Sequence, residues 1–257
     1  MNDARFHATI VTGAGSASGI GFAAARRLGE AGNRLLVTST TDRIFDRVAT
    51  LRDAGFEAEG VVADLTEASG VDAVLAGAVR AFGGADVLVN NAGMTAVTDA
   101  EDPAGIDGIS LDQWTAALDR NLTTAFRMIR AVVPGMRAAG FGRVVTVSSV
   151  SGAVQAYAGD VGYHAAKAGL VGLTRAAAID VADAGITVNA VAPGWIDTGS
   201  ATDHERSMGR ATPLGRSGTP EEVAHAVAFL ADARASYITG QLVVVDGANS
   251  INEERGL

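Results

Sequence analysis

The stretch TGAGSASGIG at residues 12–21 follows a short apolar run, ATIV, and precedes an Ala-rich segment with helical spacing. Its glycines permit positive φ angles and a close approach of the backbone to a ligand. At the start of a helix, free N–H groups and the helix dipole favour a phosphate group. The stretch does not match G-x-G-x-x-G because position 18 is serine, so by itself it indicates either a pyrophosphate site or a plain tight turn.

Short Val- and Ile-rich runs alternate with helical segments along the rest of the chain. The runs are apolar almost throughout, as strands buried on both faces are, and they lie at 8–12, 34–39, 57–63, 86–90, 142–148, 186–192 and 241–245. The helical segments between them are 19–31, 43–54, 67–82, 111–139, 160–183 and 220–231. This alternation predicts an α/β fold in which a parallel sheet of about seven strands carries helices on both faces, a doubly wound Rossmann arrangement. No linker or composition shift divides residues 1–257, so we expect a single domain.

In such sheets the ligand binds beyond the carboxyl ends of the strands. The loops that follow the first six strands are therefore the expected site, and they cover residues 13–19, 39–42, 64–66, 91–95, 149–159 and 193–212.

Composition excludes several classes of function. The net charge of −9 over 257 residues argues against nucleic-acid binding, which needs a basic surface. No apolar run approaches the roughly 20 residues that cross a bilayer, and the N-terminus lacks a secretory pattern. The chain has no cysteine and its histidines are scattered, so we expect no metal site, and we interpret the acidic residues Asp99, Glu101, Asp102 and Asp107 as a solvated loop. A cytoplasmic protein with no membrane or nucleic-acid partner is the expectation.

Five further motifs accompany the glycine-rich stretch in a fixed order. They are NNAG at 90–93, Ser149 in VSSVSG, Tyr163-His-Ala-Ala-Lys167, PGWIDT at 193–198 and TGQLVVVDG at 239–247. Together they resemble the short-chain dehydrogenase/reductase family over essentially the whole chain. The segment TPLGRSGTPEEVA at 212–224 resembles the branch of 3-oxoacyl-carrier-protein reductases and their carbonyl-reductase relatives.

The glycine-rich loop departs from the family pattern T-G-x-x-x-G-x-G. Five residues separate Gly13 from Gly19, a spacing found in the divergent enoyl reductases of the same superfamily. Those enzymes pair a tyrosine with a lysine seven positions later, whereas Tyr163 and Lys167 lie four apart and the residue seven after Tyr157 is His164. We therefore expect the loop to bind the phosphates differently from the family pattern, whereas the Tyr-Lys spacing of the ketoreductases is kept. Which backbone amides of residues 15–20 bind the pyrophosphate stays open.

Tyr163 and Lys167 share one face of a helix at this spacing. Reduction of a carbonyl group needs a proton donor beside the hydride donor, and a phenol with a pKa of about 10 needs nearby positive charge to serve. The alternative interpretation of an isolated Tyr-Lys pair is a surface tyrosine that lies above a solvated lysine and has no role in catalysis. The resemblance assigns the remaining catalytic roles to Ser149, which positions the substrate oxygen, and to Asn121, which holds a water that relays protons. Ser149 lies fourteen residues before Tyr163 instead of the family's thirteen, and Ser148 and Ser151 are its alternatives.

The resemblance also implies a set of contacts to a nicotinamide cofactor. They are Gly13, Gly15, Ser18, Gly19 and Ile20 in the glycine-rich loop, Asp64 and Leu65 near the adenine, Asn91, Ala92 and Gly93 after the fourth strand, Tyr163 and Lys167, and Pro193, Gly194, Ile196 and Thr198 around the nicotinamide.

The end of the second strand bears on which nicotinamide cofactor binds. An enzyme that prefers NAD places a carboxylate there for the ribose hydroxyls, and that carboxylate would repel a 2′-phosphate. Here Ser39 stands in that position, followed by Thr40 and Thr41, and Arg43 is near enough to contact a phosphate. Asp42 argues the other way, and a Ser/Thr-rich turn could merely cap the helix. We predict a preference for NADP(H), with NAD(H) not excluded.

These observations predict an NADP(H)-dependent reductase of small or medium ketones and aldehydes. The alternatives are a 3-oxoacyl thioester reductase and a catalytically idle nucleotide-binding subunit. Ile179, Asp180 and Asp183 stand where dedicated carrier-protein reductases offer arginine to an acidic partner, so we do not expect the main carrier-protein reductase of the cell. Residues 94–110 and a lid at about 195–212, with Tyr157 and Trp195, are expected to shape the pocket. By resemblance we also expect a homotetramer that contacts through 111–139, 160–183 and the last strand.

Overall fold

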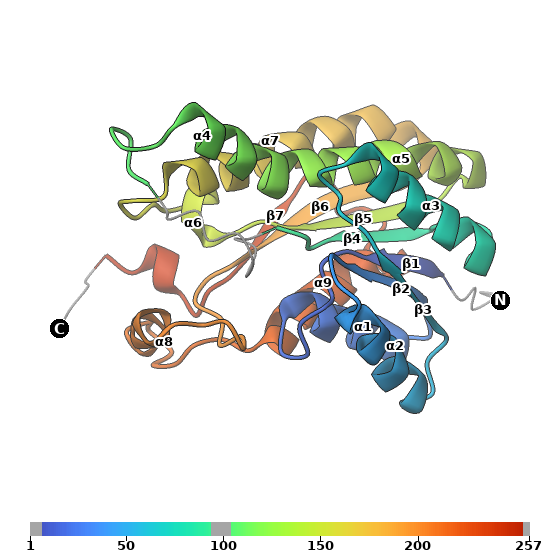
Figure 1. Cartoon of the computed structure of the whole chain (residues 1–257), viewed down its shortest axis with the longest axis horizontal. Coiled ribbons are helices and arrows are strands. Elements are labelled where there is room, and N and C mark those ends of the chain that lie inside the picture. Colours follow the sequence, from blue (N-terminus) through green and yellow to red (C-terminus); the bar gives the residue numbers. More distant parts are fainter. Residues whose placement is uncertain (1–6, 94–103, 254–257) are drawn as a thin grey trace.

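The Val- and Ile-rich runs of the sequence form one parallel sheet, which is the middle layer of the molecule (Figure 1). In the computed structural model, which describes residues 7–93 and 104–253, the seven strands lie in the order β3-β2-β1-β4-β5-β6-β7. They are β1 (Ala8–Val11), β2 (Arg34–Ser39), β3 (Ala58–Val62), β4 (Val87–Asn90), β5 (Gly142–Val147), β6 (Ile186–Pro193) and β7 (Leu242–Val245). The predicted fold class is confirmed.

Helices cover both faces of the sheet, and each layer encloses its own apolar core (Figure 1). One layer holds α1 (Ile20–Glu30), α2 (Arg43–Asp53) and α9 (Pro220–Ala231). The other holds α3 (Ala68–Phe82), α4 (Leu111–Leu118), α5 (Thr124–Ala139) and α7 (Val161–Val181). Two short helices that periodicity did not predict, α6 (Val150–Ala153) and α8 (Asp203–Arg210), lie beyond the carboxyl ends of the strands.

The predicted single helix over 111–139 is interrupted by one wide turn. A π-helical turn, Asp119–Thr123, joins α4 to α5, so the prediction of an uninterrupted helix is wrong there. Side chains satisfy the carbonyls at this turn, since Asn121 Nδ2 donates to the Ala117 carbonyl at 3.2 Å and Thr124 Oγ1 donates to the Arg120 carbonyl at 2.9 Å. Apolar spacing is helical on both sides of the turn, which is why it does not reveal the extra residue.

A set of partly buried hydrogen bonds joins the end of β1 to the end of β4, where the strand order reverses. Thr12 Oγ1 accepts from the backbone N–H of Asn91 at 3.0 Å and from that of Ala92 at 2.9 Å. In return, Asn91 Nδ2 donates to the carbonyls of Thr12 and Gly13 at 3.1 and 3.0 Å. The glycine-rich loop is therefore fastened to the neighbouring strand by contacts within the protein itself.

Two glycines of the loop are required by this fastening. Gly13 has a φ of +68°, and a Cβ there would lie 2.8 Å from the Cα of Ala92. A Cβ on Gly21 would collide with the side-chain amide of Asn91. The glycine pattern thus follows from packing against Asn91, in addition to any ligand that the loop holds.

We expect Thr12→Val to lower the free energy of unfolding by about 1–3 kcal/mol, because it leaves two partly buried N–H groups without an acceptor. Thr12→Ser keeps the hydroxyl and should cost about 1 kcal/mol or less. Urea denaturation of both variants measures the difference. Equal stability of the two variants would show that the hydroxyl does not fasten the loop.

Candidate active site

A cavity of about 1010 Å³ opens beyond the carboxyl ends of the strands, at the edge predicted for the ligand. Its wall comes from the loops after β1, β4, β5 and β6, from α4, and from the C-terminal residues Asn249 and Asn252. In Figure 1, α4 and α6 lie on one side of this end of the sheet and α8 lies on the other.

The four predicted catalytic residues all line this cavity. Lys167 lies one turn after Tyr163 on α7, with its Nζ 5.5 Å from the centre of the tyrosine ring and donating to the Val147 carbonyl at 3.2 Å. Asn121 reaches the same place from the π-helical turn. A Cβ on Gly93 would lie 3.0 Å from Asn121 Oδ1 and 3.5 Å from Lys167 Nζ, so the backbone after β4 passes beside both groups.

Burial shifts the pKa values of Tyr163 and Lys167 in opposite directions. It raises the pKa of the Tyr163 phenol, and the carboxylates of Asp160 and Glu205 raise it further, while a hydrogen bond with Ser149 offsets part of the shift. Burial lowers the pKa of Lys167 to about 8. The phenol is thus kept protonated at neutral pH, and the ammonium group is close to its titration point.

The structure distinguishes between the three serines after β5. Ser148 is buried and its hydroxyl donates to the Lys167 carbonyl at 2.9 Å, so its side chain is used within the fold. Ser149 is partly exposed, lines the cavity with Tyr163, and lies near enough to the phenol to lower its pKa. Its hydroxyl also accepts from the Ser151 N–H at 3.1 Å, which places Ser151 in the first turn of α6. Of the three hydroxyls, that of Ser149 lies beside the phenol.

The glycine-rich loop has the features of a phosphate cradle. The helix α1 begins after Gly19, and among the described residues no side chain caps its first turn. Its leading N–H groups are therefore available to an anion at the edge of the cavity, which Ile20 lines. Ser18 contacts Gly199 of the segment after β6, so the loop meets that segment directly.

Ser39 and Arg43 meet over the glycine-rich loop. A Cβ on Gly15 would lie 2.6 Å from Arg43 Nε and 2.7 Å from Ser39 Cβ. Ser39 ends β2 and is buried, with its hydroxyl donating to the Thr41 carbonyl at 2.7 Å. Thr40 and Thr41 are exposed beside them. The predicted 2′-phosphate residues therefore gather at one point of the loop.

The other predicted cofactor residues differ in whether their side chain or only their backbone can face a cofactor. Asp64 is exposed, but its carboxylate accepts from the N–H and the hydroxyl of Thr66. The side chain of Leu65 is packed in the core, so only its backbone can face a cofactor. Asn91 lines the cavity although its amide is engaged with the glycine-rich loop, and Ala92 and Gly93 continue from it. Four predicted residues at and after the end of β6 line the cavity, namely Pro193, Gly194, Ile196 and Thr198.

Several residues that line the cavity carry no signal in the sequence. Gln155 Nε2 donates to the Asn249 carbonyl at 3.2 Å, and Asn249 Nδ2 donates back to Gln155 Oε1 at 3.3 Å. This pair joins the loop after β5 to the C-terminal segment, which lies 94 residues further along the chain. Gln113, Glu205 and Met208 also line the cavity, beside the predicted Tyr157 and Trp195. These unpredicted residues belong to no motif, because only the fold brings them together. They are Gln113, Gln155, Glu205, Met208 and Asn249.

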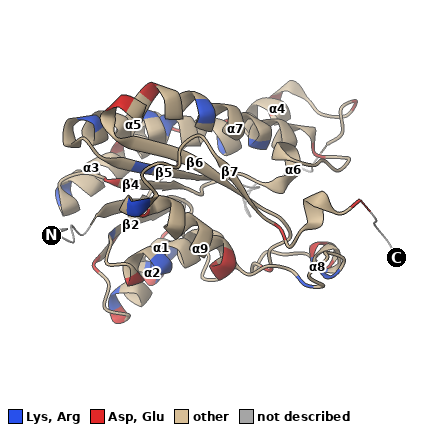
Figure 2. Cartoon of the chain, turned by 180° about the vertical axis from the view of Figure 1, so that it is seen from behind, with Lys and Arg blue, Asp and Glu red and all other residues tan. Residues whose placement is uncertain are grey.

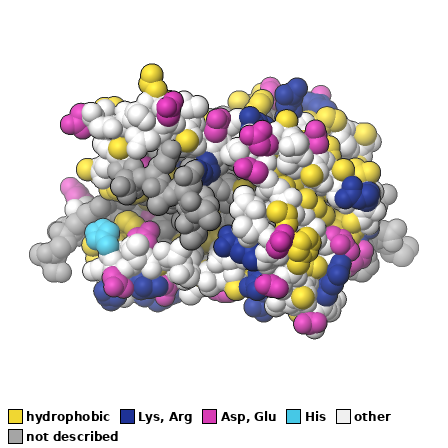
Figure 3. Space-filling view, viewed as in Figure 1, with side chains coloured by type: hydrophobic (Ala, Val, Ile, Leu, Met, Phe, Trp, Pro, Cys, Tyr) yellow, Lys and Arg dark blue, Asp and Glu magenta, His cyan; other side chains and the backbone are white. Residues whose placement is uncertain are grey.

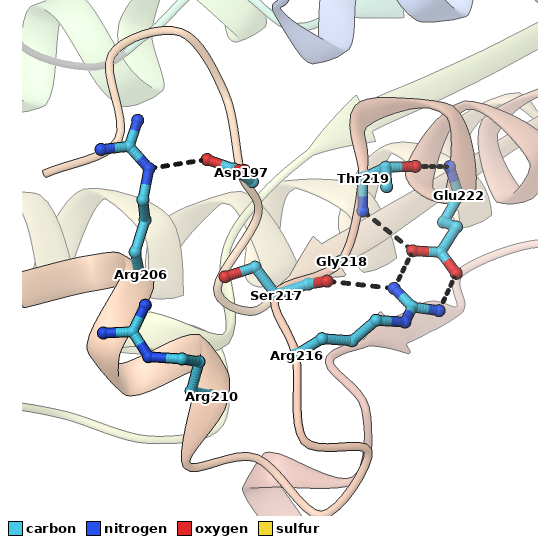
Figure 4. Close-up of a pocket in the computed structure, with 8 residues that line it drawn as sticks. All are labelled: Asp197, Arg206, Arg210, Arg216, Ser217, Gly218, Thr219 and Glu222. Atoms are coloured by element: carbon cyan, nitrogen blue, oxygen red, sulfur yellow. Dashed lines mark hydrogen bonds and ion pairs between the residues drawn. The ribbon is translucent and has the colours of Figure 1, made fainter. Parts of the chain in front are cut away.

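The predicted lid segment, 195–212, contains the helix α8. Its first turn has a capping box in which Thr202 and Glu205 bond each other's backbone. On its outer side, a hollow of about 520 Å³ separates α8 from the start of α9 (Figure 4). Arg206 Nε contacts Asp197 Oδ1 at 3.0 Å there, and Arg216 forms a two-pronged contact with Glu222 that lowers the pKa of the carboxylate to about 2. The role of this segment as a lid stays a prediction.

Surface charge, helix hydropathy and groups of metal-ligating side chains point to no further partner within the described residues. Lys and Arg positions are interspersed with Asp and Glu positions along the ribbon in Figure 2, and so are their side chains on the described part of the face in Figure 3. No helix among the described residues is long and apolar enough to cross a membrane. Within 7–93 and 104–253, no group of three metal-ligating side chains is found. Asp99, Glu101, Asp102 and most of the predicted pocket segment 94–110 lie outside the described residues.

Comparison with known proteins agrees with this geometry. The family model described as "Enoyl-(Acyl carrier protein) reductase" matches residues 13–248. The chain is a short-chain dehydrogenase/reductase. Within this family, the spacing of Tyr163 and Lys167 separates it from the divergent enoyl reductases, whose lysine lies seven positions after the tyrosine.

Relatives of this short-chain dehydrogenase/reductase cover nearly its whole length. It is 42% identical to cis-4-hydroxycyclohexanecarboxylate dehydrogenase of Sinomonas cyclohexanicum over 93% of this chain and 94% of that one. It is 38% identical to a 3-oxoacyl-[acyl-carrier-protein] reductase of Vibrio cholerae, over 93% and 95%. Among solved structures it is similar to a putative short-chain dehydrogenase/reductase from Burkholderia xenovorans, with a TM-score of 0.89, 33% identity and coverage of 96% and 98%. A variant of actinorhodin polyketide ketoreductase with NADPH gives a TM-score of 0.87 at 33% identity, over 98% and 100%.

We expect Lys167→Met to stabilise this reductase at pH 7 while it removes activity. The pKa of Lys167 falls from 10.5 to about 8 on folding, so the buried charge costs up to about 3 kcal/mol below pH 8. Between pH 8 and 10.5 the folded chain releases the proton, and the cost disappears. The gain in unfolding free energy should therefore be about 1–3 kcal/mol at pH 7 and should shrink toward pH 10. Urea denaturation at several pH values measures it, and a loss of stability at pH 7 would contradict the expectation.

Proposed function

We propose that this short-chain dehydrogenase/reductase is an NADP(H)-dependent reductase of ketones or aldehydes, and that it oxidises secondary alcohols in the reverse direction. The observation that carries the proposal is the meeting of Ser149, Tyr163, Lys167 and Asn121 in one cavity beside the glycine-rich loop. A protein that only binds a nucleotide has no need of this set, which weighs against an idle subunit.

Each of these four residues has a separate role in the proposed reduction of a carbonyl group. NADPH, when bound, supplies the hydride to the carbonyl carbon. The Ser149 hydroxyl donates a hydrogen bond to the carbonyl oxygen, and Tyr163 gives that oxygen its proton as the negative charge develops. The raised pKa of Tyr163 keeps the phenol protonated before the step. The ammonium group of Lys167 then stabilises the phenolate, and Asn121 beside it holds the water that returns the proton.

Reduction of 3-oxoacyl thioesters is the second candidate, and the relative from Vibrio cholerae favours it. The surface at the end of α7 argues against an acidic carrier protein as the donor of the substrate. Ile179 is 79% exposed there, and Arg137 is engaged with Asp183 at 3.0 Å and with the Asp180 carbonyl. Ile179 therefore stands where the resemblance places an arginine, with Asp180 and Asp183 beside it and the nearby Arg137 engaged with Asp183.

The family resemblance supports two further proposals about this chain. We infer a homotetramer in which α4, α5, α7 and β7 meet other copies, and a cytoplasmic location. Neither proposal enters the argument about the chemistry.

We expect Tyr163→Phe to lower turnover of ketones at least about a hundredfold, which is the scale of lost general acid catalysis, with NADPH affinity unchanged within a few-fold. A panel of ketones, aldehydes and acyl-carrier-protein thioesters, assayed with both nicotinamide cofactors, measures turnover, and fluorescence titration measures NADPH binding. Tyr237→Phe is the control, because Tyr237 is fully exposed.

Near-normal turnover of Tyr163→Phe would show that another group donates the proton. Salt-sensitive reduction of the acyl-carrier-protein thioester, much faster than that of free ketones, would favour the second candidate function.

The preference for NADP(H) is supported by the end of β2. Ser39 occupies the position of the carboxylate that NAD requires, and it is held inward by its bonds to Thr41. Arg43 lies over Gly15 and makes no ion pair with any residue between 7 and 93 or 104 and 253. Asp42 is exposed just before α2 and caps no N–H group with its side chain. A 2′-phosphate would therefore find one guanidinium group and the hydroxyls of the turn.

We expect NADPH to be preferred over NADH by about 1–3 kcal/mol, the scale of one or two charge-assisted hydrogen bonds. Ser39→Asp should narrow or invert the ratio of kcat/KM values, because it restores the carboxylate. Arg43→Gln should narrow the ratio too. Arg47→Gln is the matched control, since Arg47 lies one turn further along α2 over the ring of Phe22. A higher kcat/KM with NADH for the unmodified enzyme would contradict this interpretation of the turn.

A further inference from the structure

His164 joins the catalytic helix α7 to the loop at 154–160, which precedes that helix. Its Nε2 accepts the backbone N–H of Tyr157 at 3.1 Å, and its Nδ1 lies 2.6 Å from the Asp160 carbonyl. An amide N–H can only donate and a carbonyl can only accept. The two partners therefore fix the ring as the neutral tautomer that carries its proton on Nδ1.

The imidazole also contacts an aromatic side chain of the cavity wall. The ring of Tyr157 meets it edge-on at 4.4 Å between centres, and the Tyr157 hydroxyl donates to Asp160 Oδ2 at 3.4 Å. Asp160 in turn accepts the N–H of Tyr163 at the start of α7. Tyr157 lines the cavity while His164 itself does not. His164 is thus placed behind the wall that Tyr157 presents to a substrate.

The turn that begins at Gly152 and leads into this loop packs closely against the backbone of His164. Gly152 has a φ of +92°, and a Cβ there would collide with the carbonyl of His164. The Gly152 N–H donates to the Gln155 carbonyl at 2.7 Å, which closes the turn that leads to Tyr157. This is the loop with one residue more than the family spacing between Ser149 and Tyr163. The ring of His164, on α7, accepts the N–H of Tyr157 in this lengthened loop.

We propose that His164 is a positioning residue that determines substrate specificity by holding Tyr157 in the cavity wall. The proposal rests on the proposed carbonyl-reductase function. Tyr157 presents an aromatic ring to the same cavity as Ser149 and Tyr163, so the proposal assigns to it the apolar part of a substrate beyond the carbonyl group, such as a ring. It follows from the proposal that a minimal ketone, which has no such part, depends on Ser149 and Tyr163 but little on Tyr157. His164 therefore acts on the affinity for ring ketones and leaves the proton transfer unchanged.

Two conservative variants separate the two hydrogen bonds of the ring. His164→Gln keeps an acceptor near the place of Nε2, and His164→Asn keeps a donor near the place of Nδ1 but leaves the Tyr157 N–H without its acceptor. His225→Gln is the matched control, because His225 Nδ1 makes the same bond to the carbonyl four residues earlier, that of Glu221, at 2.7 Å, far from the cavity on α9.

The kinetic measurement uses 4-methylcyclohexanone and 2-butanone with NADPH. His164→Asn should raise KM for the ring ketone about tenfold with kcat within about threefold, and should change both constants for 2-butanone by less than about twofold. His164→Gln should recover most of the KM, and His225→Gln should equal the unmodified enzyme. Equal losses for both ketones, or no loss for either, would overturn the proposal.

Hydrogen–deuterium exchange tests the structural step without any activity. The Tyr157 amide should exchange faster in His164→Asn than in His164→Gln or in the unmodified chain. Equal exchange in all three would overturn the proposal. If the unmodified enzyme reduces no ketone, the proposed function fails, whereas ketone reduction without the KM difference contradicts only the role of His164.

Discussion

The hydroxyl of Thr12 accepts two consecutive backbone N–H groups from the end of β4, and the whole site is arranged around that contact. It holds together the two strands between which the sheet order reverses. The amide of Asn91 then fills the space between Gly13 and Gly21, so the shape of the glycine-rich loop is set before any ligand binds. Two residues further on, Gly93 lies against Asn121 and Lys167. Only three residues, 91–93, therefore connect the glycine-rich loop to Asn121 and Lys167, the groups to which we assign proton transfer.

The same site pairs two groups that burial drives in opposite directions. A buried phenol resists losing its proton, and a buried ammonium group tends to lose its own. Each group is disfavoured by burial in its charged form, which is the form that the proposed reaction needs. The fold tolerates this because it is stabilised elsewhere, by the two apolar cores on either side of the sheet.

The sheet, its helices and the meeting of the four candidate residues in one cavity could be predicted because each leaves a local or motif-level signal. Val-rich runs mark the strands, and Tyr163 and Lys167 are recognisable four residues apart. The π-helical turn at Asn121 and the wall built from Gln155 and Asn249 leave no such signal, and the helix α8 leaves only the capping-box pattern of Thr202 and Glu205. Their positions are decided by contacts between segments far apart in the chain, such as the 94 residues that separate Gln155 from Asn249. The lengthened loop before Tyr163 was visible as a count of residues, but its support by His164 was not.

The wide turn at 119–123 has a consequence for how such a protein can change over evolutionary time. One surplus residue in a helix rotates everything that follows by about 100° around the axis. The buried face of α5, with Met128 and Val132, is packed in the register that includes this surplus. Deleting one residue from the turn would restore a regular helix, but it would swing that face out of the core or carry Asn121 out of the cavity. The register of the core and the position of Asn121 in the cavity are therefore coupled, and mutations cannot change one of them over evolution without changing the other.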